Sequence, residues 1–244
     1  MNNNDRGKNI KGPWYQFKPL YKHIDEGFGA IAEAFSDAAQ RLNEVISKQK
    51  FANSSIPLSF LYRHSIGLFL KSLIIILHRK INIPFENHKW SKYAIKSEKG
   101  VIPLENIHEI KILYYYFRCL LNQNNGFLKE FTNTDWNSIP NELEDWIDEI
   151  DKFDVRSTVF RYPGLYDELK SDFKESAISD IRPSIDANQE PIKAFLEVDK
   201  NDNIANVYKL DNSRLQSIII ILEKALDILS TIHFAARCEL GNGS

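Results

Sequence analysis

The chain has 244 residues, of which 43% are hydrophobic and 12% aromatic, and this length and composition predict one large domain with a buried core. Lysine and arginine together number 31, and aspartate and glutamate 33. The net charge of -2 excludes a global field that would draw the protein to nucleic acid or to an anionic membrane. The two cysteines, Cys119 and Cys238, lie in apolar helical patterns, and we expect them to be buried and to stay reduced in the cytoplasm.

Residues 1–18 are expected to form a flexible amino-terminal tail, and residues 19–240 a single helical domain. The start of the chain is polar and rich in asparagine, without an apolar stretch that could serve as a signal peptide. The most apolar segment, residues 66–77, is interrupted by Gly67 and Lys71 and is too short to span a bilayer. We therefore expect no membrane span.

Two long helices are predicted first. Residues 20–50 carry apolar side chains at intervals of three and four, which is the stripe of an amphipathic helix. Pro57 suits the first turn of a second helix over residues 58–80, which is apolar nearly all round. Because such a helix has to be buried, it is expected at the centre of a bundle.

Residues 81–104 are interpreted as a connecting segment, because they contain prolines and a glycine and few periodic apolar residues. A third helix is expected over residues 105–122. A fourth begins near Pro140, and its carboxylates lie opposite its apolar stripe. That arrangement predicts a solvated acidic face rather than a metal site.

An insertion is expected over about residues 154–210, before the last helix. Residues 165–177 have a short helical pattern, and an Asx-rich turn between two β-prone runs predicts a hairpin. The β-prone runs of the insertion are residues 156–162, 193–198 and 204–210.

A last long helix is expected over residues 212–240, so the predicted fold class is mostly α. The architecture is an antiparallel bundle of four or five long helices with a small helix and β-hairpin insertion. Residues 73–77 and 218–222 are both runs of five apolar residues, which point all round a helix. A bundle of this size has little room for two centres, so we expect one run to face a partner, either a second copy or another protein.

Polar side chains recur every seven residues, or about two turns, along the central helix. In one interpretation this strip faces solvent or satisfies buried hydrogen bonds. In the other it lines a polar slot, where Gly67 permits close approach and Arg63, His64 and Lys71 bind an anionic group such as a phosphate. The recurring pairs are His64 with Ser65, Lys71 with Ser72, and His78 with Arg79.

A weaker candidate site lies in the connecting segment, where lysines alternate with aromatic residues. Lys89, Trp90, Lys92 and Tyr93 could contact a phosphate backbone and stack a base, but the same density of lysine is ordinary for a solvated loop. No group of residues has the spacing that names a metal, and there is no phosphate-binding loop or serine elbow. We expect no metal and no cofactor.

Three stretches of the chain share motifs with one family of helical bundles. On these motifs the chain resembles HEPN proteins of the larger bacterial type, over about residues 20–240. We expect His64, Lys71 and Arg161 to form one cluster, and Tyr162 and Arg63 to join them in a site for a nucleotide or phosphate. The motifs are Leu61-Tyr62-Arg63-His64-Ser65-Ile66-Gly67-Leu68-Phe69-Leu70-Lys71, Ile107-His108-Glu109-Ile110 and Phe160-Arg161-Tyr162-Pro163.

Two departures from the family bear on activity. Gly67 stands where the family has a glutamate, so the pairing of that carboxylate with Lys71 or Arg161 is missing. HEPN ribonucleases resemble one another in an arginine, four to six intervening residues and a histidine on a late helix, and no arginine of this chain has a histidine at that distance. Because histidine is the side chain best tuned to transfer protons near neutral pH, this argues against ribonuclease activity.

The resemblance implies a non-catalytic HEPN-like subunit of a bacterial antiphage defence or toxin–antitoxin complex. Such a subunit would bind a nucleotide-like signal or an effector enzyme such as a sirtuin-like NADase. Two alternatives stay open. One is a metal-independent ribonuclease toxin that uses His64, Lys71 and Arg161 in place of the usual motif, and the other is a purely structural, dimerising bundle.

Overall fold

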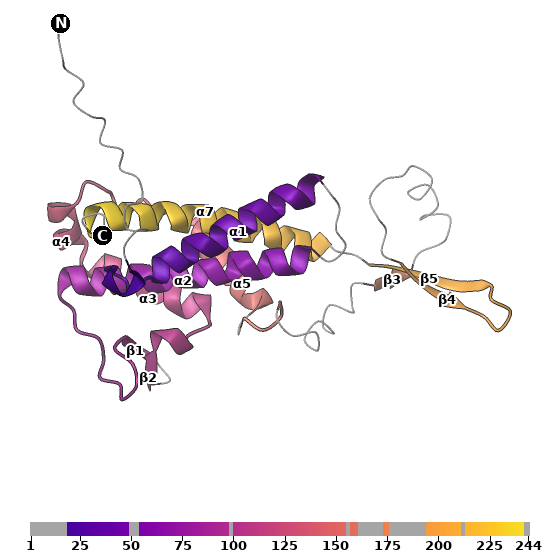
Figure 1. Cartoon of the computed structure of the whole chain (residues 1–244), viewed down its shortest axis with the longest axis horizontal. Helices are drawn as coiled ribbons and strands as arrows, with labels where there is room; N and C mark the ends of the chain where they lie inside the picture. The colour runs from indigo at the N-terminus through magenta and orange to yellow at the C-terminus, as the bar shows by residue number, and fades with distance from the viewer. Residues whose placement is uncertain are drawn as a thin grey trace, which may run out of the picture.

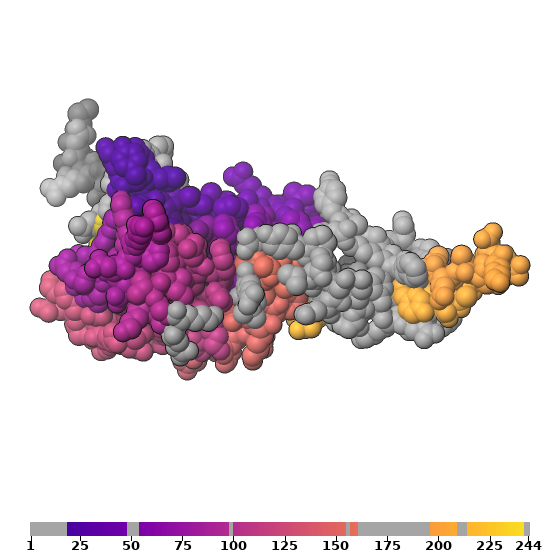
Figure 2. All heavy atoms as spheres, turned by 90° about the horizontal axis from the view of Figure 1, so that it is seen from below, coloured from indigo at the N-terminus to yellow at the C-terminus, as the bar shows by residue number. Residues whose placement is uncertain are grey.

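The protein is mostly helical, as the sequence predicts, with long helices that lie side by side in a bundle (Figure 1). A β-hairpin projects beyond the end of the bundle at which the last helix begins, and Figure 2 shows the same hairpin at one end of the molecule. The computed structural model describes residues 19–48, 54–97, 100–154, 157–160, 173–175, 194–210 and 213–241.

The centre of the bundle is α2 (Ser55–Ile81), which is surrounded by α1 (Phe28–Lys48), α3 (Ile110–Gln123) and α7 (Ser213–Glu239). Every residue of α2 from Phe69 to His78 is buried, as expected for a helix that is apolar nearly all round. Among the described helices, α2 alone is long and apolar enough to cross a membrane, but 72% of its most apolar window is buried inside the bundle. This is the placement of a core helix.

The two apolar runs have different surroundings. All five residues of 73–77 in α2 are buried, whereas in α7 the side chain of Ile220 is 52% exposed and Ile221 is only partly buried. Phe234, further along α7, is 58% exposed. The helix that occupies the centre is therefore α2, and α7 keeps apolar side chains on its outer face.

Two shorter helices complete the bundle. α4 (Asn125–Phe131) follows α3, and α5 (Glu142–Phe153) packs against α3 and α7 through its buried aliphatic residues. The outer face of α5 is acidic and solvated, as predicted. Its exposed carboxylates belong to Glu142, Glu144, Asp145 and Glu149.

Two small antiparallel sheets are present in the described residues. β1 (Ala94–Ser97) pairs with β2 (Gly100–Pro103), and this hairpin lies inside the segment that the sequence predicted only as a connection. The second sheet has the order β3-β5-β4. Its strands are β3 (Phe173–Glu175), β4 (Ala194–Val198) and β5 (Ile204–Leu210).

The predicted hairpin of the insertion is confirmed by β4 and β5. Asp199 holds the turn between them, because its carboxylate accepts hydrogen bonds from the main-chain N–H groups of Asn201 and Asn203, at 2.8 and 2.9 Å. Residues 173–175, which were expected to be helical, form strand β3 instead because they pair with β5.

Other local predictions are wrong for identifiable reasons. Residues 157–160 form a bend and turn rather than a strand, because the Asp154 carboxylate accepts hydrogen bonds from the main-chain N–H groups of Thr158 and Val159. Cys119 is exposed and Cys238 partly exposed, so neither is the buried thiol that its helical pattern suggested. The predicted tail and the other parts of the insertion lie outside the described residues.

Candidate functional site

A cluster of buried polar side chains joins three elements of the bundle. We call Asp25, Ser72, His233 and Arg237 the Asp25 cluster. Asp25 precedes α1, Ser72 lies at the middle of α2, and His233 and Arg237 are one turn apart on α7. All four side chains are buried.

The Asp25 carboxylate binds every other member of the cluster. One oxygen, Oδ1, lies 3.3 Å from Arg237 Nη1 and accepts a hydrogen bond from the main-chain N–H of Gly27. The other, Oδ2, accepts hydrogen bonds from the Ser72 hydroxyl at 2.5 Å and from the main-chain N–H of Gly29 at 2.7 Å, and lies 3.8 Å from His233 Nε2.

Burial raises the pKa of the Asp25 carboxyl, but its partners more than offset this effect. The close approach of His233, the hydrogen bond from Ser72 and the charge of Arg237 hold the pKa well below the ordinary value of 3.8. Asp25 is therefore an ionised carboxylate inside the bundle, and its negative charge offsets the charge of Arg237.

Three side chains are arranged in space like the catalytic triad of a serine hydrolase, with Ser72, His233 and Glu33 in the places of the serine, the histidine and the acid. His233 Nε2 lies 3.0 Å from Ser72 Oγ, and His233 Nδ1 lies 3.8 Å from Glu33 Oε1. The direction of the hydrogen bonds is wrong for catalysis, however. Because Ser72 donates its only proton to Asp25, Nε2 of His233 has to donate to Ser72 rather than accept from it. With Ser72 fully buried, the arrangement is structural.

Arg63 and Lys71, two of the predicted ligand-binding residues, lie together on another side of α2. Arg63 Nη2 donates to the main-chain oxygens of His108 and Asp154, at 2.5 and 3.4 Å, and its Nε lies 3.8 Å from the Asp154 carboxylate. Lys71 Nζ donates to the main-chain oxygen of Glu105 at 3.3 Å. These contacts satisfy buried hydrogen bonds, as the first interpretation of the polar strip supposes.

Burial lowers the pKa of the Lys71 ammonium to about 8. The charge of Glu105 raises this pKa, and the charge of Arg63 lowers it further. Gly67 lies between Arg63 and Lys71, one turn from each, and a Cβ there would be 3.8 Å from Arg63 Nη1, an ordinary contact. An alanine would therefore fit here, so the close approach that the glycine was expected to permit is not used within the described residues.

His64 contacts different elements from Lys71. Its ring meets the edge of Phe35 of α1, with the ring centroids 4.6 Å apart, and stacks on Phe60 at 5.5 Å. The structure thus brings Arg63 and Lys71 together and places His64 against α1. Arg161 and Tyr162 lie outside the described residues.

The basic and aromatic residues after α2 also separate into two pairs. Lys92 lies 3.4 Å from the Glu26 carboxylate, and the hydroxyl of the buried Tyr93 accepts a hydrogen bond from Arg79. By contrast, Trp90 is 79% exposed, and the Lys89 ammonium lies 4.6 Å from the centre of its ring. In the described residues no group of histidine, cysteine or acidic side chains could hold a metal ion.

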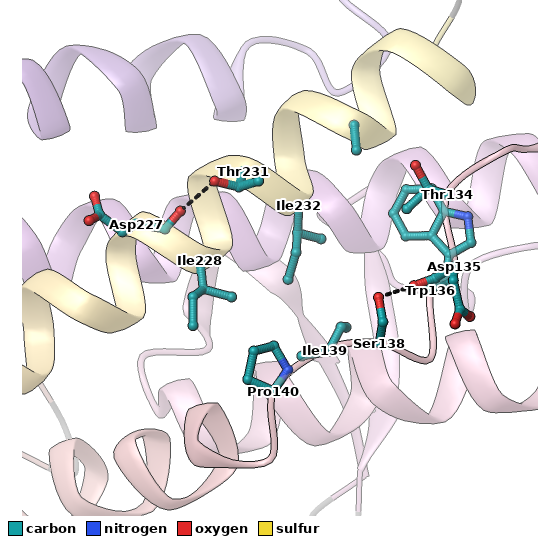
Figure 3. A pocket seen from close by; sticks show the side chains of 11 residues that line it. Thr134, Asp135, Trp136, Ser138, Ile139, Pro140, Asp227, Ile228, Thr231 and Ile232 are labelled. Carbon is teal, nitrogen blue, oxygen red and sulfur yellow. Dashed lines mark hydrogen bonds between the residues drawn. The ribbon is translucent and has the colours of Figure 1, made fainter.

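A groove lies between α7 and the segment that precedes α5 (Figure 3). Its volume is about 380 Å³, within the range of roughly 300 to 1,000 Å³ that is typical of ligand pockets. Most of the lining is apolar, and the two charged side chains in it are both acidic. The lining residues are Thr134, Asp135, Trp136, Ser138, Ile139, Pro140, Asp227, Ile228, Thr231, Ile232 and Ala235.

The non-helical wall of this groove is anchored to the bundle. The Glu239 carboxylate of α7 accepts hydrogen bonds from the main-chain N–H groups of Asn133 and Thr134 and from the Thr134 hydroxyl. The Trp136 indole N–H donates to the hydroxyl of Thr132 at 2.8 Å. The groove is therefore formed by the folded chain before any partner binds.

Sequence reasoning missed the groove, although part of its signal was present. Ile228, Ile232 and Ala235 recur at helical spacing, but the same spacing describes core positions. Trp136 and Ile139 are large apolar residues in an otherwise polar connection, and only the fold shows that they lie opposite α7. Comparisons of the chain with protein-family models, with curated proteins and with solved structures find no match.

Proposed function

We propose that this chain is a non-catalytic HEPN-like subunit of a bacterial defence or toxin-type assembly, located in the cytoplasm. Its role in the proposal is to bind a protein effector, such as a sirtuin-like NADase. The proposal joins the motif resemblance with the contacts of the described residues.

The observation that carries the non-catalytic part is the burial of the histidine and arginine on the last helix. His233 and Arg237 are 1% and 2% exposed, and both contact Asp25. A general acid or base has to come within hydrogen-bond reach of the reacting group, and a buried, paired side chain does not. The alternative ribonuclease site has little support, because Lys71 is buried against Glu105 and the His64 ring contacts the rings of Phe35 and Phe60.

A protein partner fits the exposed surface better than an anionic ligand does. A nucleotide or phosphate would have to displace the main-chain oxygens that Arg63 and Lys71 contact. Among the candidate residues that the structure describes, an exposed cation lies beside an exposed aromatic ring only at Lys89 and Trp90. Binding of a nucleotide-like signal is therefore the less favoured part of the proposal. The preformed groove and the exposed Phe234 give an apolar surface of the kind that binds proteins.

The test is direct binding to a defined effector. The chain is purified and mixed with a purified sirtuin-like NADase from its native host, and the complex is measured by size-exclusion chromatography with light scattering. We expect a stable complex in which the NADase or other activity of the effector changes. The chain would then act on its partner's activity and not on RNA. Two proteins that elute separately, with unchanged effector activity, would count against the proposal.

A further inference from the structure

We infer that the groove between α7 and residues 134–140 binds a short segment of the partner protein in which apolar residues are flanked at both ends by lysine or arginine. This inference rests on the proposed function, because it specifies how the effector is recognised. It follows from the apolar middle of the groove, its length along α7 and the charges at its two ends.

The middle of the groove is apolar on both walls. Ile228 and Ile232 project from α7 toward Ile139 and Pro140 of the facing segment (Figure 3). The two isoleucines are only partly buried in the free protein, so an incoming apolar side chain would remove their remaining surface from water. The middle therefore favours aliphatic or aromatic side chains over polar ones.

The length of the groove limits the size of the bound segment. On α7 the lining runs from Asp227 to Ala235, a rise of eight residues, which corresponds to about 12 Å along a helix. About four residues of extended chain, or two turns of helix, cover that distance. The occupant is therefore a short linear segment rather than a folded domain.

The charges of the groove are at its ends. Figure 3 shows Asp227 at one end and Asp135 at the other, with the apolar side chains between them. Both acidic residues are exposed, and Asp135 is held in place by the hydrogen bond that its Oδ1 accepts from the main-chain N–H of Asn137 at 3.1 Å. Since the lining contains no cation, positive side chains at both ends of the segment would complement it.

The same charges disfavour a second copy of this chain as the occupant. A symmetric dimer uses the same surface patch on both subunits, so two grooves in contact would bring Asp227 and Asp135 against like charges. Lys224, one turn before Asp227, does not neutralise that end from within the lining, because its ammonium lies 5.7 Å from the centre of the Trp146 ring. The occupant that fits is a different, basic segment.

Peptide selection on the intact chain tests the inference. A phage-displayed dodecapeptide library is selected against the purified chain, and the tightest peptides are measured by calorimetry. We expect the selected peptides to share two or three apolar residues between lysines or arginines. Their affinity should fall about 3- to 10-fold in the double variant Asp135→Asn, Asp227→Asn, since exposed ion pairs are worth only modest energies. Ile232→Glu should abolish binding.

The matched control is Asp37→Asn, which removes an exposed carboxylate on α1, outside the groove. It should leave peptide affinity unchanged, and circular dichroism checks that every variant is folded. Selected peptides without basic residues, or undiminished binding by the folded double variant, would overturn the inference.

Residues 8–18 of this chain also carry lysines on both sides of aromatic residues, so a peptide of that sequence is included. If it binds the groove more tightly than any selected peptide, the groove belongs to the chain's own amino terminus and the assignment to a partner is wrong. Formation of the effector complex distinguishes a failure of the groove assignment from a failure of the proposed function. A complex that forms equally well with Ile232→Glu would refute the groove assignment and leave the proposed function intact.

Discussion

The Asp25 carboxylate lies where the start of α1, the middle of α2 and the end of α7 meet. Its oxygens accept hydrogen bonds from Gly27, Gly29 and Ser72, and its charge offsets that of Arg237. A buried charge is tolerated when it is paired and its hydrogen-bonding capacity is satisfied. The ionised Asp25 carboxylate thus links the start of α1 to α2 and α7.

Replacing this carboxylate should strongly destabilise the fold. Asp25→Asn leaves the Arg237 charge uncompensated inside the bundle, and breaking a buried pair typically costs about 3 to 5 kcal/mol. Urea denaturation measures the loss, and the exposed Asp37→Asn should stay within about 0.5 kcal/mol of the wild type. A loss below about 1 kcal/mol would mean that the pair contributes little.

The same substitution has a defined pH dependence. The pKa of Asp25 is lower in the folded chain than its ordinary value of 3.8, so the ionised carboxylate stabilises the fold above that value and loses its effect as the pH falls below it. The stability difference between wild type and Asp25→Asn should therefore be constant from pH 5 to 7 and shrink as the pH falls toward 2. A difference that grows on acidification would contradict the assignment.

Gly29 offers a second test at the scale of a residue. A Cβ at this position would overlap His233 Nε2 and lie 2.6 Å from Asp25 Oδ2, and both groups are buried. Gly29→Ala should lower the free energy of unfolding by about 1 to 3 kcal/mol, as overpacking does. In Gly126→Ala the new Cβ meets nothing within 4 Å, so this control should be neutral or slightly stabilising. Equal thermal shifts in both variants would refute the close packing at Gly29.

At the scale of the elements, α2 is held by cations as well as by its apolar surface. Arg63 ties it to the start of α3 and the end of α5, and Lys71 ties it to the turn before α3. The periodic polar strip that the sequence displays therefore separates into contacts with different neighbours. Ser65 donates to the main-chain oxygen of Ala32 in α1 and Ser72 to Asp25, while Lys71 contacts the α3 side.

The buried Lys71 ammonium should lower the free energy of unfolding near neutral pH. Its pKa is about 8 in the folded chain, against an ordinary 10.5, so the fold disfavours the charged form. This cost is present below pH 8 and disappears as the pH rises toward 10.5. Lys71→Met should therefore be more stable than the wild type at pH 7, by about 1 kcal/mol or more, with the difference narrowing toward pH 10.

The control for this prediction is Lys111→Met. The Lys111 ammonium lies 3.1 Å from the Asp148 carboxylate at a site that is partly exposed, so its removal should change stability by less than about 1 kcal/mol without that pH trend. Urea denaturation of both variants at pH 7 and pH 10 makes the comparison. A Lys71→Met variant less stable than the wild type at pH 7 would show that its hydrogen bond outweighs the cost of burial.

The helices of the bundle could be predicted because their signal is periodic and long. A helix that is apolar nearly all round, such as α2, has to occupy the centre. Shorter elements depend on partners that are distant in sequence, which is why β1, β2 and β3 were missed. Cys119 was misjudged because an apolar pattern on α3 does not reveal which of its faces remains uncovered.

At the scale of the whole molecule, the sequence likewise could not predict which distant polar residues come into contact. The sequence indicated Arg63 and Lys71 as polar residues of one apolar helix, and both donate to main-chain oxygens of the segment before α3, those of His108 and Glu105. The Asp25 cluster could not be found in this way, because Asp25 and His233 are 208 positions apart (233 − 25) and meet only in the folded bundle. The groove likewise needs two segments that the fold brings together.

The most direct test of the central claim is an RNA cleavage assay. Purified chain is incubated with total RNA and with tRNA, beside an HEPN ribonuclease that has the complete arginine–histidine motif as the positive control. Because His233 and Arg237 are built into the core, we expect the RNA to stay intact with the wild type and with His64→Ala alike. Cleavage by the wild type that His64→Ala abolishes would contradict the account and establish a ribonuclease with a non-standard site.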